Sequence, residues 1–277
     1  MKKCIIIFSL IKVFFVIAQE PRQLGSLLYK EVSADIETAP VFARDDAADD
    51  ICILENKSAP DQSLIISSDK KYGIIVYDLK GDKINEYNLG RINNVDIIPS
   101  KSLEHHFIVC ATNRSHNSID LYLFNESGAL IKHLLRTKVK SLKDVYGITF
   151  YNGDVNTYLF VSDKKGHVEQ WIYNNDESEP KISKLRSLKF SSLVEGIVAD
   201  EFKAKVYIAQ ERKGIWEINV SPALPLNRKL IYKKNKFIIK PENSLARKGV
   251  LVVNDYDTLV DYVNDSKYNE WILQDYR

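Results

Sequence analysis

Short apolar segments with period-two alternation recur along the chain, each followed by a polar turn and a second apolar segment. Five versions of this unit are LIISSDKKYGIIVYDL (64–79), FIVCATNRSHNSIDLYLF (107–124), YLFVSDKKGHVEQWIY (158–173), VYIAQERKGIWEI (206–218) and VLVVNDYDTLVDYV (250–263). The spacing of Ile74 and Val76 is that of one face of a strand, and Val, Ile, Tyr and Thr dominate the apolar runs. The pattern predicts an all-β chain built from hairpins.

The hairpins repeat at a regular interval. Markers in the five turns, Asp69, Asn113, Asp163, Glu211 and Asp255, are separated by 44, 50, 48 and 44 residues. This interval is the length of one β-propeller blade, a four-stranded unit that buries its faces against its neighbours. The repeat therefore predicts a β-propeller, with the turns converging at one mouth of the ring.

Three of the cations in these turns are Lys70, Arg114 and Lys164, each directly after its marker residue. If the turns face one another, the three form one cationic ring. The alternative is that Lys70 and Lys164, with their neighbours Lys71 and Lys165, are ordinary solvated turn residues.

The first eighteen residues, MKKCIIIFSLIKVFFVIA, join a basic start to an apolar run that ends in a small residue. This pattern predicts a signal peptide over residues 1–18, followed by one propeller domain over 19–277. The alternative is an uncleaved membrane anchor, but Lys12 interrupts the run and the run is short for a span. We expect a secreted or periplasmic protein that has no membrane association after cleavage.

Net charge and cysteine content further limit the partners and the covalent cross-links to be expected. Of 39 Lys and Arg residues three lie in residues 1–18, which leaves 36 against 37 Asp and Glu. No basic excess remains to suggest nucleic acid as a partner. Cys52 and Cys110 end or interrupt apolar strands, so two buried free thiols are expected, with a disulfide as the alternative in an exported protein.

Seven segments carry a resemblance to a known family. They are ETAPVFARDDAADDICIL (37–54), SDKKYGIIVYDLKGDKINEYNLGRINNVDII (68–98), ATNRS (111–115), VYGITFY (145–151), SDKKGHVEQW (162–171), VEGIVADE (194–201) and YIAQERKGIWE (207–217). Their order and spacing resemble those of the β-propeller phytases. The resemblance implies a six-bladed propeller that hydrolyses calcium-bound phytate, the hexakisphosphate of myo-inositol.

The chemistry of phytate accounts for these residue types. A polyanion requires cations to hold it and to offset charge on the transferred phosphoryl group, and calcium requires hard oxygen ligands. The resemblance assigns phosphate binding and catalysis to Lys70, Arg114 and Lys164, and a catalytic position beside the substrate phosphate to Tyr146. It assigns catalysis together with bridging calcium ligation to Asp50. It assigns further calcium ligation to Glu37, Glu195, Glu211 and Glu242. Tyr146 also fits a plain strand aromatic, and Asp49 and Asp50 fit a solvated turn.

The resemblance weakens after residue 220. In KPENSL (240–245) Glu242 keeps one expected carboxylate, but Lys240 stands where the family has an aspartate. The family continues beyond the position of Arg277 into a sixth repeat, so we expect the last blade to be incomplete.

Three functions remain open from the sequence. The first is a monomeric, calcium-dependent 3-phytase acting on phytate or another phosphorylated small molecule. The second is a non-catalytic secreted propeller that binds a phosphorylated or acidic ligand, and the third is another calcium-containing six-bladed enzyme, such as a lactonase.

Overall fold

The computed structural model describes residues 34–176, 178–233, 237–241, 251–253 and 271–275. The chain divides into two compact units, one of which is Ala34–Lys234. In the other unit, β17 (Phe237–Pro241) pairs with both β18 (Leu251–Val253) and β19 (Trp271–Asp275) to form a three-stranded sheet. Glu242, Lys240's side chain and the predicted signal peptide lie outside the described residues. No helix in the described part of the chain is long and apolar enough to cross a membrane.

The larger unit consists of four antiparallel sheets of four strands, each strand pairing with the next in the chain. Blade 1 contains β1 (Ala48–Leu54), β2 (Leu64–Asp69), β3 (Gly73–Asp78) and β4 (Lys83–Asn88), with the short 3-10 helix η2 (Pro60–Gln62) between β1 and β2. Blade 2 contains β5 (Ile92–Pro99), β6 (His106–Asn113), β7 (Ser118–Asn125) and β8 (Leu130–Lys138).

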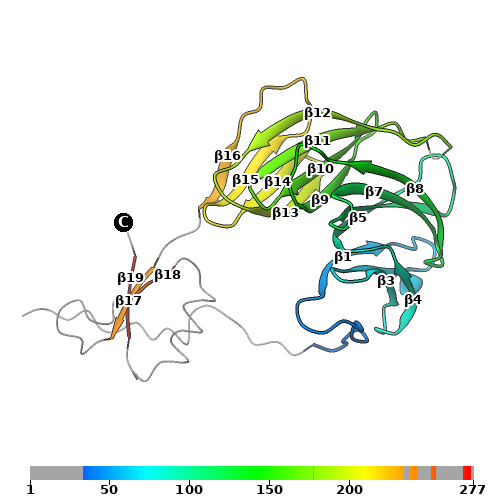
Figure 1. Ribbon diagram of the computed structural model, residues 1–277, viewed down its shortest axis with the longest axis horizontal. Coiled ribbons are helices and arrows are strands. Elements are labelled where there is room, and N and C mark those ends of the chain that lie inside the picture. The colour runs from blue at the N-terminus through cyan, green and yellow to red at the C-terminus, as the bar shows by residue number, and fades with distance from the viewer. Residues whose placement is uncertain (1–33, 177, 234–236, 242–250, 254–270, 276–277) are drawn as a thin grey trace, which may run out of the picture. The chain divides into compact units, whose positions relative to one another are not determined.

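The same order is repeated twice more. Blade 3 contains β9 (Val145–Asn152), β10 (Thr157–Asp163), β11 (His167–Tyr173) and β12 (Ile182–Lys189). Blade 4 contains β13 (Val194–Asp200), β14 (Lys205–Gln210), β15 (Gly214–Asn219) and β16 (Lys229–Lys233). The four blades form a fan in which the first strands β1, β5, β9 and β13 contact one another in succession (Figure 1).

The all-β propeller architecture is confirmed, but the described residues form four blades and not the six expected. The described stretch from β1 to β16 accommodates four units of 44 to 50 residues, which accounts for the four blades. Four of the five predicted hairpins form the β2–β3, β6–β7, β10–β11 and β14–β15 pairs. Most of the fifth lies outside the described residues, and its start forms β18.

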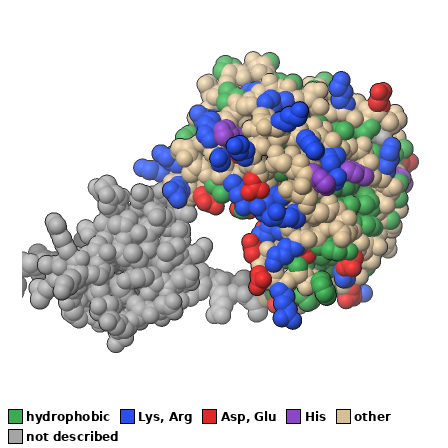
Figure 2. Space-filling view, viewed as in Figure 1, with side chains coloured by type: hydrophobic (Ala, Val, Ile, Leu, Met, Phe, Trp, Pro, Cys, Tyr) green, Lys and Arg blue, Asp and Glu red, His purple; other side chains and the backbone are tan. Residues whose placement is uncertain are grey.

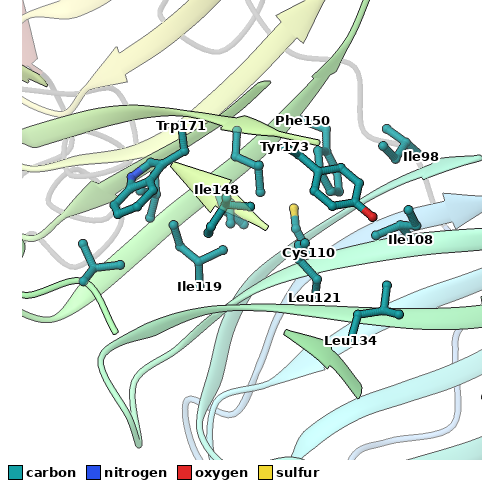
Figure 3. Packing of buried hydrophobic residues seen from close by; sticks show 14 of the residues in the cluster. Ile98, Ile108, Cys110, Ile119, Leu121, Leu134, Ile148, Phe150, Trp171 and Tyr173 are labelled. Carbon is teal, nitrogen blue, oxygen red and sulfur yellow. The ribbon is translucent and has the colours of Figure 1, made fainter. Parts of the chain in front are cut away.

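The apolar residues pack between blades rather than within one sheet. One cluster fills the space between blades 2 and 3, where Ile108, Cys110 and Leu121 meet Phe150 and Tyr173 (Figure 3). Two further clusters occupy the interfaces between blades 1 and 2 and between blades 3 and 4. Removal of this apolar surface from water is what holds successive blades together.

A hydroxyl on the second strand of blades 1 to 3 adds a polar link at each interface. Each hydroxyl accepts a backbone N–H from the first strand of its own blade and donates to a carbonyl on the first strand of the next. The links are Asp50 N to Ser68 to Asn93 O (3.0 and 2.5 Å), Asn94 N to Thr112 to Tyr146 O (3.0 and 2.5 Å), and Gly147 N to Ser162 to Val194 O (2.9 and 2.8 Å). These bonds satisfy backbone groups at the edges of adjacent sheets.

Cys52 and Cys110 are buried and free, as expected from the sequence. Burial raises the pKa of both thiols well above the ordinary value, because a thiolate would lose its hydration there.

Candidate functional site

The turns between the second and third strands of the blades carry four of the predicted site residues. Lys70, Arg114, Lys164 and Glu211 each directly follow the second strand of their blade. In three of these turns the backbone N–H donates to the carbonyl of a residue just before the first strand, from Lys70 to Ala47 (2.8 Å), from Arg114 to Arg91 (2.8 Å) and from Glu211 to Leu193 (3.2 Å). Equivalent positions in the repeat therefore present three cations and one carboxylate.

Lys70 is held by two carboxylates of the segment that enters blade 1. Its Nζ lies 3.1 Å from an oxygen of Asp49 and also contacts Asp46, and its side chain is 12% exposed. Burial opposes the charged form, but Asp46 and Asp49 outweigh it and raise the pKa of Lys70. Lys71, at 45% exposure, lies 3.7 Å from Asp45 and turns away from this pair.

Asp144 pairs with the cations of blades 2 and 3. Its Oδ1 accepts from Arg114 Nε at 2.9 Å, its Oδ2 accepts from Arg114 Nη2 at 3.3 Å, and Lys164 Nζ lies 3.7 Å from the same Oδ2. One carboxylate therefore lies between two of the three cations that the sequence assigns to phosphate.

Tyr146 and Glu195 connect blades 3 and 4. Lys164 Nζ lies 4.8 Å from the ring centroid of Tyr146, within the range of a cation–π contact. Burial, the charge of Glu195 and a hydrogen bond to Glu195 all raise the pKa of Tyr146, so its hydroxyl stays protonated near neutral pH and serves as a hydrogen-bond donor. Burial is also the first cause that raises the pKa of Glu195, and the neighbouring carboxylates Asp49 and Glu211 add to it.

These residues belong to one electrostatic neighbourhood, which we call the charged cluster. It consists of Asp46, Asp49, Lys70, Arg114, Asp144, Tyr146, Lys164, Glu195 and Glu211. The charges of Lys70 and Lys164 both act on Asp46, and that of Lys70 also acts on Glu195. Arg114 acts on Tyr146, so all four blades contribute. Figure 2 shows cationic and anionic side chains interspersed along the inner edge of the fan, near β13 and β1.

The side chain of Asp50 is directed toward β5, whereas that of its neighbour Asp49 is directed toward Lys70. Its Oδ2 accepts from Asn94 Nδ2 at 2.9 Å and from the backbone N–H of Val95 at 3.0 Å, and burial raises its pKa despite these bonds. The structure therefore places Asp50 in a link from β1 to β5, and Asp49 toward Lys70. The β1–β2 register shifts between Ala48 and Ile51, which changes the face that each of the two aspartates presents.

Glu37 is not brought to the cluster. Its backbone carbonyl packs against Gly81, in the turn that follows β3, and Gly81 O accepts the N–H of Ala39 at 2.8 Å. That turn lies at the end of β3 opposite Lys70.

Asp46, Asp49 and Asp144 are the cluster members that the sequence assigned to no role. Asp46 and Asp49 lie in an acidic run that also fits a solvated turn. Asp144 gives no motif signal, but it adopts a left-handed backbone conformation with φ of 65°, which is uncommon outside glycine and concentrates at functional sites.

Metal-binding capacity is limited within the residues that the structure describes, where no three His, Cys, Asp or Glu side chains group closely enough to hold an ion. Asp49, Glu195 and Glu211 do supply the carboxylate oxygens that calcium prefers, and the charges of Asp49 and Glu211 oppose ionisation of Glu195, a repulsion that a bound cation would relieve. Glu195 and Glu211 also line an open depression of about 310 Å³ on blade 4.

Comparison with known proteins places this arrangement in a family. The family model described as Phytase matches residues 7–236. The chain is 35% identical over 205 residues to a protein of Bacillus subtilis (strain 168) named 3-phytase, which covers 69% of this chain and 53% of the relative. The chain thus spans about half the length of that curated relative.

Among solved structures, Saccharomyces cerevisiae Sqt1 matches with a TM-score of 0.42 and 15% identity, over 61% of this chain and 48% of that one. This likeness is too low to bear on function. The family match over most of the chain identifies it: this protein is a member of the Phytase family.

Proposed function

We propose that the charged cluster binds phytate and hydrolyses its phosphate monoesters with the help of calcium. The observation that carries the proposal is the presence of Lys70, Arg114 and Lys164 on equivalent turns of three consecutive blades, in a chain of the Phytase family. The relative named 3-phytase supports the same reaction.

The cluster residues fit distinct parts of this reaction. Cations from different blades would hold different phosphate groups of one polyanion and offset charge on the group being transferred. Tyr146, kept protonated by burial and by Glu195, would exchange its hydrogen bond to Glu195 for one to a phosphate oxygen. Asp49, Glu195 and Glu211 would hold calcium, and Asp50 would act by fixing β1 to β5 next to them. When bound, calcium would supply further positive charge against the phosphoryl group.

The direct test is phosphate release from phytate by the purified protein, with added calcium and with a chelator. We expect release with calcium and its loss with chelator. Phytate binding without release in either condition would favour the second candidate, a non-catalytic propeller that binds a phosphorylated ligand. Neither binding nor release would remove both.

Matched lysine pairs sharpen this test. Lys70→Ala and Lys164→Ala should weaken phytate binding by about 1.5–3 kcal/mol each, the usual cost of losing a charge-assisted hydrogen bond. Lys71→Ala and Lys165→Ala, in the same turns, should change binding little, because exposed lysines contribute little. Equal effects within a pair, measured by isothermal titration calorimetry, would show that the turns are only generally basic.

We also propose export after cleavage near residue 18 and a monomeric state. Mass spectrometry of the protein recovered outside the cell and light scattering of the purified chain test the two points. A retained N-terminus, or a mass of twice the mature chain, would contradict them.

A further inference from the structure

The backbone of Asp144 is held by hydrogen bonds that do not involve its own side chain. Asn117 Oδ1 accepts the N–H of Asp144 at 2.9 Å and that of Val145 at 3.1 Å, while its Nδ2 donates to the carbonyls of Val139 and Leu142, both at 2.8 Å. Asn117 and Asp144 both have positive φ, 50° and 65°. The amide of Asn117 therefore clamps the whole β8–β9 connection and sets the direction in which Asp144 leaves the backbone.

That direction brings the carboxylate onto the guanidinium of Arg114. Both Asp144 oxygens accept from the fork of Arg114, the geometry in which arginine also binds a phosphate group. The Arg114 side chain is 14% exposed and its Nη1 also lies 3.4 Å from Asn93 Oδ1, so few donors of the fork remain for a second anion.

Lys164 Nζ lies 3.7 Å from Oδ2 of the same carboxylate. Asp144, at 44% exposure, is therefore a solvent-accessible anion between two cations of different blades. A phosphate group that bound both cations would need the space and the donors that Asp144 uses.

We propose that Asp144 is an internal competitor of phosphate, which sets the affinity of the Arg114–Lys164 pair for the phosphate groups of the substrate. The inference rests on the proposed function, which assigns phosphate binding to Arg114 and Lys164. Phosphate must displace the carboxylate from the guanidinium, so a single weakly charged phosphate binds poorly and a polyanion held also by Lys70 binds well.

The direction in which one substitution changes the affinity for phosphate tests this proposal. Asp144→Asn keeps the size of the side chain, and asparagine tolerates the left-handed backbone conformation. It removes one negative charge beside the phosphate position, so inorganic phosphate should bind about tenfold more tightly, with at least a comparable gain for phytate. Binding is measured by isothermal titration calorimetry on the full chain with a chelator present, so that calcium does not contribute.

The matched control is Asp154→Asn. Asp154 is an exposed aspartate of the same blade in the β9–β10 turn, at the opposite end of the strands from Lys164. It should leave phosphate affinity unchanged.

A second variant tests the clamp. Asn117→Gly keeps access to positive φ but removes the amide, so it should also tighten phosphate binding, and it should add nothing in an Asn117→Gly, Asp144→Asn double variant. Additive gains would overturn the positioning role of Asn117.

Three results would overturn the proposal. Weaker phosphate binding by Asp144→Asn would mean that Asp144 orients Arg114 for the ligand, and unchanged binding would mean that it does not share the phosphate position. Absence of phosphate and phytate binding in every variant, both with chelator and with added calcium, would remove the proposed function as well.

Discussion

Blades 3 and 4 begin with the same sequence phrase, VYGI at Val145 and VEGI at Val194, yet the two glycines meet different surroundings. A Cβ on Gly147 would lie 1.9 Å from the carbonyl oxygen of Glu195, whereas one on Gly196 would meet Ala209 Cβ at 3.3 Å. The second strands differ as well, with Ser162 in blade 3 and Ala209 in blade 4. The first strand of blade 3 is thus fixed to a neighbouring blade through contacts whose counterparts in blade 4 are absent among the described residues.

The comparison extends to the charged cluster. At the same turn position blade 3 supplies Lys164 and blade 4 supplies Glu211. The contacts that join blades 3 and 4 also fix the backbone next to Tyr146 and Glu195, so stability and site geometry depend on the same residues.

The largest expected effect is that of Gly147→Ala. The added Cβ collides with backbone that cannot move without separating β9 from β13, so we expect a loss of more than about 4 kcal/mol of unfolding free energy. Gly196→Ala should cost less than about 1 kcal/mol. Denaturant unfolding of both variants measures the difference, and similar losses would show that the two interfaces are equivalent.

The next effect is that of Ser162→Ala. The change leaves the N–H of Gly147 and the carbonyl of Val194 without their buried partner, which should cost about 2–3 kcal/mol. The reciprocal Ala209→Ser should change stability by no more than about 0.5 kcal/mol. A neutral Ser162→Ala variant would contradict the role given to the hydroxyl links.

A pH-dependent effect separates Asp163 of blade 3 from its blade 4 counterpart Gln210. Burial opposes ionisation of Asp163, but the amides of His167, Lys165 and Lys143 and the ring of His167 outweigh it and lower the pKa of the carboxyl. The unfolded chain, with a pKa of about 3.9, then binds more protons than the folded one in this range.

The stabilisation from Asp163 is therefore complete above pH ~4 and is lost as the pH falls through the lowered pKa of the folded state. We expect Asp163→Asn to destabilise the chain at pH 7 and the difference from the unmodified chain to shrink below pH ~4. Gln210→Ala should show a difference that does not depend on pH. Thermal unfolding across pH measures both, and a pH-independent Asp163→Asn effect would refute the assignment.

The smallest expected effect concerns the two carboxylates of blade 4. Because the charge of Glu211 contributes to the raised pKa of Glu195, Glu211→Gln should lower the pKa of Glu195 toward its ordinary value. NMR titration of the side-chain carboxyl checks this. No change would place Glu211 too far away to share a cation with Glu195.

The repeat was readable from the sequence because the hairpins are local. Asp69 to Gly73 and Asp163 to His167 close short turns between apolar strands, and period-two alternation locates such strands. The predicted number of six blades was wrong for the described residues, which form four, since this number depends on how many units assemble rather than on any one of them.

The site was only partly predictable for a different reason. Adjacent aspartates 49 and 50 are equivalent in composition, and only the register shift in β1 decides which one meets Lys70. Asp144 reaches Arg114 because Asn117, 27 residues earlier, holds its backbone in a left-handed conformation. Such pairings depend on tertiary structure and leave no local pattern.

The two buried thiols allow the opening of the blade interfaces to be measured chemically. Cys52 packs at the interface of blades 1 and 2, and Cys110 packs between blades 2 and 3. Because burial raises the pKa of both, neither presents an accessible thiolate while the blades stay packed. The rate at which a thiol reagent labels each cysteine therefore reports how often its interface opens, and it does so without any engineered probe.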